Sequence, residues 1–235
     1  MSDIAMMDLA GMYPAVRRRL EQWAGYEVLS LVLQQCKDVE CFLAGGVIRN
    51  CVLGLPPPDK DFDFFLDGPS VGRALDIFRK HGELATTPFG SARWHPAGDP
   101  ERSADLIRID EFRPGLWRCE DIIDVLNQFD YTASALAFDL RTAQAFNPQN
   151  GLRDLGRRTM RMIRFDYPDT SFTAGAELTM NAILWFRILH YARMLSLVIE
   201  PLTLRWLRSH REFERHAESF RATFFRPCNG YLEPL

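Results

Sequence analysis

Apolar residues recur along this chain with two different spacings. Spacing typical of amphipathic helices covers residues 7–35, 71–81, 177–197, 201–208 and 212–225, with shorter helical segments at 47–53 and 122–126. Short apolar or alternating runs, typical of strands, occur at 42–44, 61–66, 83–95 and 103–109. The pattern therefore predicts a first part that mixes strands with helices and a last part that is helical.

Composition indicates a soluble globular protein. Hydrophobic residues make up 47% of the chain and charged residues 25%, and no window reaches the roughly 20 uninterrupted apolar residues of a membrane span. The N-terminus lacks a basic region before an apolar one, and the five cysteines form no Cys-x-x-Cys pair. We therefore expect a cytoplasmic protein with reduced thiols, without a zinc site and without a membrane partner.

The net charge of −3 hides an asymmetry between two parts of the chain. Residues 1–140 hold 14 Lys and Arg against 22 Asp and Glu, whereas residues 141–235 hold 14 against 9. An acidic first part and a basic last part suit a metal site beside an anionic polymer. A chance distribution of surface charge is an equally good interpretation.

Residues 41–66 carry the strongest candidate chemistry. A short strand meets Gly45-Gly46, where backbone N–H groups can approach an anion, and Arg49 lies one helical turn further on. After a proline loop, Asp61 and Asp63 alternate on a second strand, so their carboxylates point to the same side. Paired carboxylates facing an anion site are what Mg²⁺ needs to bridge a protein and a triphosphate.

This stretch resembles the head domain of class II nucleotidyltransferases, the family of CCA-adding enzymes and bacterial poly(A) polymerases. The family pattern is Gly-Gly, two residues, Arg-Asp, an apolar helix, a Gly-containing loop and then Asp-x-Asp. Gly45, Gly46, Arg49 and Gly54 match this pattern, and Asn50 stands where the family has Asp. The resemblance implies that Gly45, Gly46 and Arg49 orient a nucleoside triphosphate and that the two aspartates hold Mg²⁺.

The resemblance leaves two registers open for the metal pair. An ungapped match places it at Asp59 and Asp61, whereas a loop two residues longer places it at Asp61 and Asp63. We prefer the second register because the apolar run 64–66 follows Asp63 directly. The family carries a third carboxylate on a later strand, and Asp105 is our candidate; the alternative for Asp105 is a surface residue on an edge strand.

Three further segments resemble the family and imply nucleotide contacts. Among their matching residues, those that imply nucleotide binding are Asp130 in the segment 129–139, Arg161 at the end of the segment 147–161, and Arg187 in the helical region. Five arginines crowd residues 153–164, which suits either a phosphate-facing cluster or a solvated helix face. Gln128 and Phe129 replace two family arginines, so triphosphate binding is weaker here or differently supported.

The base-reading motif of the family, Glu-Asp-x-x-Arg, is replaced by the segment Met180–Leu184. None of its three charged residues is retained, so we expect no complete C-C-A addition to tRNA. The chain also ends soon after this region, and we expect the body and tail helices that hold tRNA in the family to be absent.

The resemblance implies an α+β fold, with a small mixed or antiparallel sheet flanked by helices and a short helical neck. We expect the head at residues 1–165 and the neck-like region at 176–226. The implied activity is Mg²⁺-dependent transfer of a nucleoside monophosphate from a nucleoside triphosphate to an acceptor hydroxyl, for which RNA is one candidate. The alternative is an inactive nucleotide- or RNA-binding homologue. The sequence does not identify the acceptor, the nucleotide or the oligomeric state.

Overall fold

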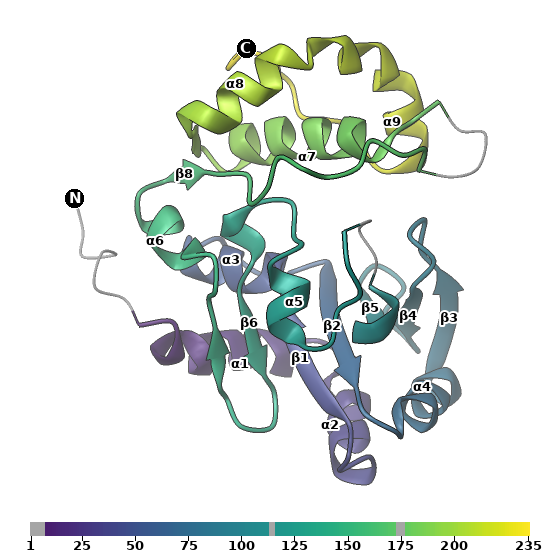
Figure 1. The fold of residues 1–235 in the computed structure, drawn as a ribbon. Coiled ribbons are helices and arrows are strands. Elements are labelled where there is room, and N and C mark those ends of the chain that lie inside the picture. The colour runs from purple at the N-terminus through teal and green to yellow at the C-terminus, as the bar shows by residue number, and fades with distance from the viewer. Residues whose placement is uncertain (1–7, 113–115, 173–176) are drawn as a thin grey trace.

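The computed structural model describes residues 8–112, 116–172 and 177–235, and Figure 1 shows its fold. The strands are β1 Glu40–Ala44, β2 Asp61–Asp67, β3 Gly82–Thr86, β4 Ala92–Pro96, β5 Ser103–Arg108, β6 Ala137–Asp139, β7 Ala145–Phe146, β8 Thr159–Met160 and β9 Val198–Ile199. The α-helices are α1 Tyr13–Glu21, α2 Tyr26–Gln35, α3 Gly46–Val52, α4 Val71–Lys80, α5 Ile122–Leu126, α6 Gly151–Gly156, α7 Met180–Met194, α8 Pro201–Ser209 and α9 Ala217–Thr223. Short 3₁₀ helices are η2 Ala10–Met12, η3 Ile109–Glu111, η4 Thr132–Ser134 and η5 Arg211–His216.

Seven strands form one mixed sheet in the order β3-β4-β5-β2-β1-β6-β7. Within it β2 and β5 are parallel, and the other pairs are antiparallel. The predicted α+β fold with a mixed sheet and flanking helices is confirmed. The two central strands, β1 and β2, follow directly from the apolar and alternating runs at 42–44 and 61–66.

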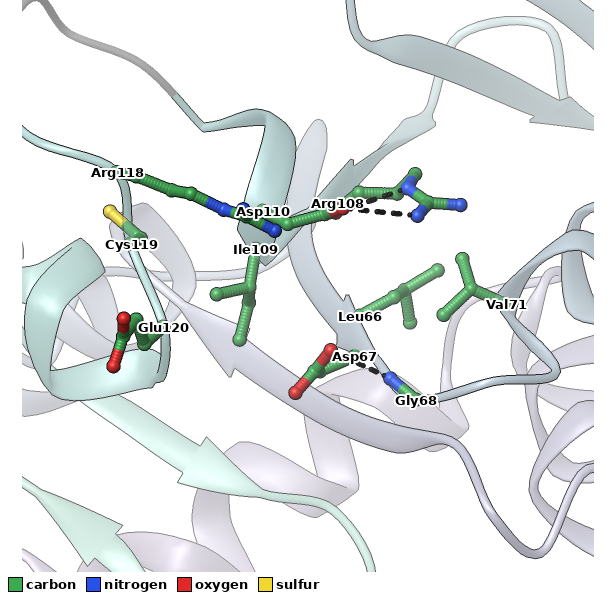
Figure 2. Close-up of a pocket in the computed structure, with 10 residues that line it drawn as sticks. All are labelled: Leu66, Asp67, Gly68, Val71, Arg108, Ile109, Asp110, Arg118, Cys119 and Glu120. Carbon is green, nitrogen blue, oxygen red and sulfur yellow. Dashed lines mark hydrogen bonds and ion pairs between the residues drawn. The ribbon is translucent and has the colours of Figure 1, made fainter.

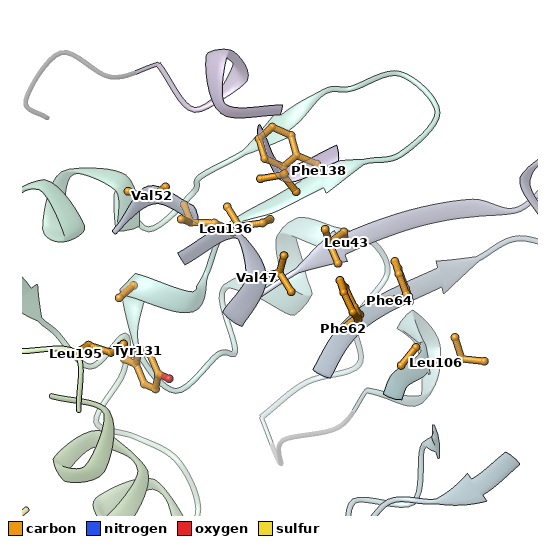
Figure 3. Packing of buried hydrophobic residues seen from close by; sticks show 14 of the residues in the cluster. Leu43, Val47, Val52, Phe62, Phe64, Leu106, Tyr131, Leu136, Phe138 and Leu195 are labelled. Carbon is orange, nitrogen blue, oxygen red and sulfur yellow. The ribbon is translucent and has the colours of Figure 1, made fainter. Parts of the chain in front are cut away.

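Alternation along β2 separates two hydrophobic cores. Phe62, Phe64 and Leu66 pack into the larger core with α1, α2, α3 and α4, part of which Figure 3 shows. Phe65 points to the other face and packs into a smaller core that includes α5. Because residues two apart share a face, Asp61 and Asp63 lie on the same face as Phe65.

Two of the predicted elements were wrong in extent. Residues 83–95 are not one strand but the antiparallel hairpin of β3 and β4, because Pro88 and Gly90 (φ 88°) make a turn between them. The helical pattern at 7–35 is divided between α1 and α2, with a break at residues 22–25.

The last part of the chain is helical, as the pattern predicts. Helices α7, α8 and α9 form a layer at one end of the sheet (Figure 1). The predicted linker at 166–175 lies partly outside the described residues, and the division into a head and a neck stays a prediction. In the described parts of the chain, no helix combines the length and the apolar character that crossing a membrane requires.

Candidate active site

The three predicted carboxylates lie next to one another on one face of the sheet. Asp61 and Asp63 are two residues apart on β2, and the parallel register places Asp63 beside Asp105 of β5. The same register places Asp61 beside Ser103, whose Oγ donates to Asp61 Oδ1 at 2.9 Å. The structure thus brings the three predicted aspartates together at the start of β2 and β5.

Arg93 of β4 holds the third carboxylate in a bidentate ion pair. Its Nε donates to Asp105 Oδ1 at 2.7 Å and its Nη2 donates to Asp105 Oδ2 at 2.9 Å. The hydrogen bonds to Asp105 raise the pKa of Arg93 above its ordinary value. Sequence interpretation missed this residue because it treated 83–95 as one strand; the alternation of Arg93 and His95 around buried Trp94 is the signal that could have found it.

The magnesium site stays a prediction, and Asp61 and Asp63 are the residues that suit it. Among the described residues, no group of three or more His, Cys, Asp and Glu side chains is arranged to hold a metal ion. Both carboxylate oxygens of Asp105 accept hydrogen bonds from Arg93. Asp61 and Asp63 remain, and Mg²⁺ is commonly held by one or two carboxylates together with water and substrate phosphates. A third ligand at Asp105 stays a prediction.

Asp63 has an unusual affinity for protons. Burial raises the pKa of its carboxyl group to about 7, and the negative charges of Asp105 and Asp61 act in the same direction. The positive charges of Arg187 and Arg49 oppose this shift. A carboxyl group of this kind gains most from a nearby cation.

Gly45 makes room for Asp63. Its backbone has φ 78°, a conformation that favours glycine, and its N–H donates to the carbonyl of Leu136 at 3.1 Å. A side-chain carbon at position 45 would lie only 2.8 Å from Asp63 Oδ2. At the first residue of α3, a side-chain carbon on Gly46 would lie 3.4 Å from Arg49 Nη2. Both glycines therefore border predicted site residues.

Arg49 is a buried cation without a carboxylate partner among the described residues. Its side chain donates to the Oγ of Ser134 at 2.9 Å and to the Oη of Tyr131 at 3.2 Å. The guanidinium also lies over the ring of Tyr191 of α7, 5.1 Å from the ring centre. Because a buried charge is costly unless it is paired, Arg49 is suited to receive an anion.

Asn50 explains why Arg49 lacks that partner. Its Oδ1 accepts from Arg49 Nη2 at 2.9 Å, while its Nδ2 donates to Asp59 Oδ1 at 3.0 Å. Asp59 is buried and also forms an ion pair with Arg19 at 3.0 Å. An aspartate at position 50 would repel Asp59, whereas the amide bridges the two charges. Asp59 is thus engaged by contacts away from Asp61 and Asp63.

The predicted residues Asp130 and Arg187 meet each other across the boundary between the sheet and α7. They form an ion pair, and the Arg187 guanidinium lies 5.8 Å from the ring centre of Tyr191. Tyr191 is therefore in contact with both Arg49 and Arg187, although it was not among the predicted site residues. Helix α7 contributes a cation and an aromatic ring to the candidate site.

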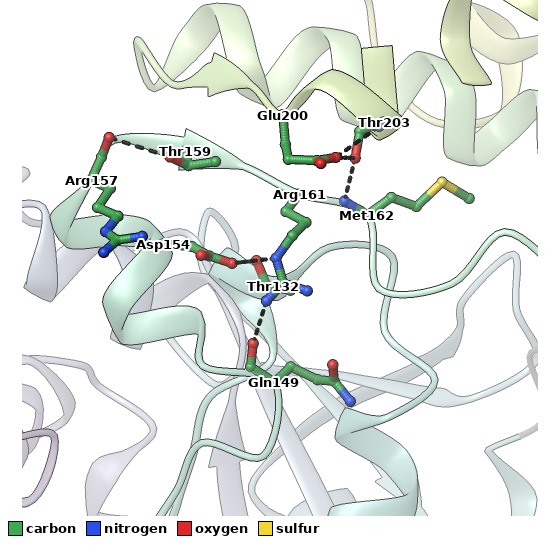
Figure 4. A network of polar contacts seen from close by, with 9 residues as sticks. All are labelled: Thr132, Gln149, Asp154, Arg157, Thr159, Arg161, Met162, Glu200 and Thr203. Carbon is green, nitrogen blue, oxygen red and sulfur yellow. Dashed lines mark hydrogen bonds and ion pairs between the residues drawn. The ribbon is translucent and has the colours of Figure 1, made fainter. Parts of the chain in front are cut away.

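Arg161 lies in a separate polar network, which Figure 4 shows. Its Nε donates to Asp154 Oδ2 at 2.9 Å and its Nη2 donates to the carbonyl of Gln149 at 2.7 Å. Thr132 Oγ1 donates to the same Asp154 oxygen at 2.6 Å. The structure therefore engages Arg161 in internal contacts and does not bring it together with the aspartates of β2.

Gln128 and Phe129 have structural contacts of their own. The family that the sequence resembles has arginines at these two positions. Gln128 is buried, and its amide bonds to both the N–H and the carbonyl of Trp117. Phe129 packs against Phe65 and Phe112 in the smaller core. Neither position offers a charge to a phosphate.

A separate pocket of about 340 Å³ lies at the other ends of β2 and β5, and Figure 2 shows its lining. It is bordered by the turn after β2, by Arg108 and Asp110 after β5, and by Arg118. Arg108 pairs with Asp110, so these charges are at least partly neutralised. The pocket contains none of the predicted site residues.

No protein-family model and no curated protein matches this chain. Solved structures match it, among them a CCA-adding enzyme with CTP, a tRNA nucleotidyltransferase complexed with a primer tRNA and an incoming ATP analogue, and a tRNA-processing enzyme with CTP. Each is 20% identical, with TM-scores of 0.62, 0.57 and 0.56 over 88%, 81% and 82% of this chain.

The match covers only part of each solved structure. The chain covers 49%, 52% and 48% of those three structures, so it spans about half their length. At this identity the likeness concerns the fold: this chain shares the α+β fold found in CCA-adding enzymes.

Proposed function

We propose that this protein is a Mg²⁺-dependent nucleotidyltransferase that moves a nucleoside monophosphate from a nucleoside triphosphate to a hydroxyl group of an RNA. The observation that carries the proposal is the position of Asp63 beside Gly45, with Asp61 two residues away on β2 and with the charge of buried Arg49 acting on Asp63. Arg49 has no carboxylate partner in the described residues. Cation-binding and anion-binding groups at one place are what a triphosphate with its metal requires. The shared fold with tRNA nucleotidyltransferases supports the same class of reaction.

The proposed roles follow from these contacts. Asp61 and Asp63 hold Mg²⁺, which when bound neutralises phosphate charge and favours attack by the acceptor hydroxyl. Gly45 and Gly46 leave space for the phosphates, and Arg49 supplies a positive charge.

On the Tyr191 side, Arg187 adds a second charge, oriented by its ion pair with Asp130. Asp105 is the proposed third carboxylate, and Arg161 supports the site from its internal network.

The direct test is incorporation of label from each nucleoside triphosphate, labelled at the α-phosphate, into RNA with a free 3′ hydroxyl. We expect labelled RNA and pyrophosphate with Mg²⁺ and neither product with EDTA. Asp61→Asn should abolish both products, whereas Asp67→Asn, at the other end of β2, should not. Product formation by Asp61→Asn at the parent rate would contradict the proposed site.

A second candidate function is nucleotide or RNA binding without turnover. The ion pair of Arg93 with Asp105 and the internal contacts of Gln128 and Phe129 favour it, because they remove charges from the site. Three carboxylates kept close to one another disfavour it, since like charges repel at a cost to stability. Nucleotide binding without pyrophosphate release, for all four nucleotides, would select this second function.

A further inference from the structure

The five arginines of residues 153–164 fall into two groups in the structure. Two of them are neutralised: Arg161 pairs with Asp154 at 2.9 Å, and Arg164 pairs with Asp166 at 2.6 Å. Arg164 also lies over the ring of Trp117. These two arginines therefore have partners within the chain, which leaves the other three as candidates for binding a ligand.

Arg153, Arg157 and Arg158 form what we call the α6 arginine patch. All three are exposed, and within residues 8–112, 116–172 and 177–235 none of them has an ion-pair partner. Helix α6 turns its buried residues Leu152 and Leu155 inward, which leaves Arg153 on the outer side. Figure 4 draws no interaction of the Arg157 guanidinium, although it shows that residue beside the Arg161 network.

Local energetics only partly account for the patch, because the C-terminal end of α6 favours positive charge while two other features oppose these arginines. Arg153 and Arg157 are four residues apart in a helical turn, where like charges repel. Arg158 follows the end of α6 with φ 53°, at the position where helices usually place glycine. The partial negative charge at the end of α6 favours one basic residue, but it does not account for three adjacent ones. Three neighbouring arginines without ion-pair partners in the described residues therefore point to an anionic ligand.

The location of the patch connects it with the candidate active site. Helix α6 packs against α3, which carries Gly46 and Arg49, and against η4. The carbonyl of Arg158 accepts from the N–H of Val198 at 2.7 Å, so the patch borders both the sheet region and the C-terminal helices. In Figure 1, α6 lies at the side of the molecule where α3 and the C-terminal layer approach each other.

We propose that the α6 arginine patch binds the phosphate backbone of the RNA strand that acts as acceptor. The inference rests on the proposed function, which supplies an RNA substrate. Arginine is well suited to this role, because its planar guanidinium donates two parallel hydrogen bonds to a phosphate. Contacts of this kind position a strand without reading its sequence.

The test is direct binding of a fluorescent RNA hairpin with a single-stranded 3′ tail, measured by anisotropy in EDTA without nucleotide. The variant Arg153→Ala/Arg157→Ala/Arg158→Gly should bind about tenfold or more weakly at low salt. Its plot of log affinity against log salt should be shallower by about 2, because each phosphate contact of a single strand contributes about 0.7. Arg158→Gly alone should bind more weakly with an equal or higher melting temperature, since glycine prefers its backbone conformation.

The matched control is Arg73→Ala, an exposed arginine of α4 without an ion-pair partner in the described chain. Figure 1 shows α4 on the opposite side of the molecule from α6. Unchanged affinity and salt dependence in the triple variant, or an equal loss in Arg73→Ala, would overturn the proposal. Competition by polyglutamate as effective as that of RNA would also overturn it and would indicate an acidic protein partner. If the parent protein binds RNA but releases no pyrophosphate from any nucleoside triphosphate, that result would instead count against the proposed function.

Discussion

Arg93 donates two hydrogen bonds to the carboxylate of Asp105, which lies beside Asp63 in the parallel register of β2 and β5. The positive charge thus sits at the edge of a row of aspartates and limits their mutual repulsion. Because Arg93 engages both oxygens, it also competes with a metal ion for Asp105. Replacement of Arg93 should therefore destabilise the protein without metal, but it should increase the stabilisation that Mg²⁺ provides.

Arg93→Gln should lower the unfolding free energy by about 1–2 kcal/mol, because it leaves Asp105 without its counter-charge in a partly solvent-screened position. Adding Mg²⁺ should recover more stability in this variant than in the parent protein, since Asp105 becomes available as a ligand. Thermal unfolding with and without Mg²⁺ measures both effects. Arg93→Gln/Asp105→Asn is the control and should lose the extra recovery. A magnesium shift no larger than that of the parent would show that Asp105 is not a ligand.

Asp61→Ala should abolish both Mg²⁺ binding and nucleotide transfer. The apo protein should stay equally stable or become slightly more stable, because Asp61 is exposed and its charge repels that of Asp63, which offsets the lost hydrogen bond from Ser103. Calorimetric titration with Mg²⁺ and thermal unfolding measure the two effects separately. Normal transfer by this variant would mean that the site has been assigned to the wrong strand.

A comparison of Asp59→Ala with Asp63→Ala decides the register of the metal pair. Asp59→Ala should keep most of its transfer activity per folded molecule, whereas Asp63→Ala should lose it. Asp59→Ala should nevertheless be about 3–5 kcal/mol less stable, because it leaves the nearly buried Arg19 without its partner. Activity must therefore be measured at low temperature and normalised to folded protein. The opposite pattern of activity would support Asp59 and Asp61 as the pair.

The stability of the apo protein should depend on pH through Asp63. Its pKa is raised to about 7 from the ordinary value of 3.8, so the folded state holds this proton more tightly than the unfolded state. The resulting stabilisation is present below about pH 4 and is lost as the pH rises to about 7. Chemical denaturation between pH 4 and 8, without metal, measures it. Asp63→Asn should remove this part of the pH dependence, and an identical profile in the variant would contradict the assignment.

Local patterns predicted the elements that carry the candidate site. Alternation between aspartate and phenylalanine identified β2 and the shared face of Asp61 and Asp63. The interval 122–126 was predicted as a helix and is α5. In both cases the pattern of neighbouring residues determines which side of an element is buried, so the sequence alone is sufficient.

Contacts between residues far apart in the sequence could not be predicted from local patterns. The pairing of Arg93 with Asp105 depends on the register of β4 with β5, which no local pattern encodes. Asn50 was recognised as a departure from the family, but its bridge to Asp59 became visible only when the proline loop was placed beside α3. Tyr191 was not among the predicted site residues, because its position beside Arg49 follows from the packing of α7.

Under the proposed function, the residues at the start of α7 predict how strongly the protein distinguishes one nucleotide from another. Asn181 Nδ2 donates to the carbonyl of Tyr167 at 3.2 Å, and Leu184 is buried and apolar. Together with Met180, these two residues stand where the family that the sequence resembles has three charged residues. A site without polar groups for the base edge discriminates by only about 10²-fold, whereas a hydrogen-bonding site can reject the wrong ligand by about 10⁴-fold or more.

We therefore predict that the protein does not add C, C and A in order to tRNA. If it is active, it should add one kind of nucleotide or show kcat/KM values for the four nucleotides within about 10²-fold of one another. The measurement is extension of tRNA that lacks its 3′ end, with CTP plus ATP and with each nucleotide alone, beside a CCA-adding enzyme as the positive control. Ordered addition of C, C and A would refute this prediction. It would mean that base selection uses other side chains, and Arg187, which lies beside Tyr191 and pairs with Asp130, would be the first to replace.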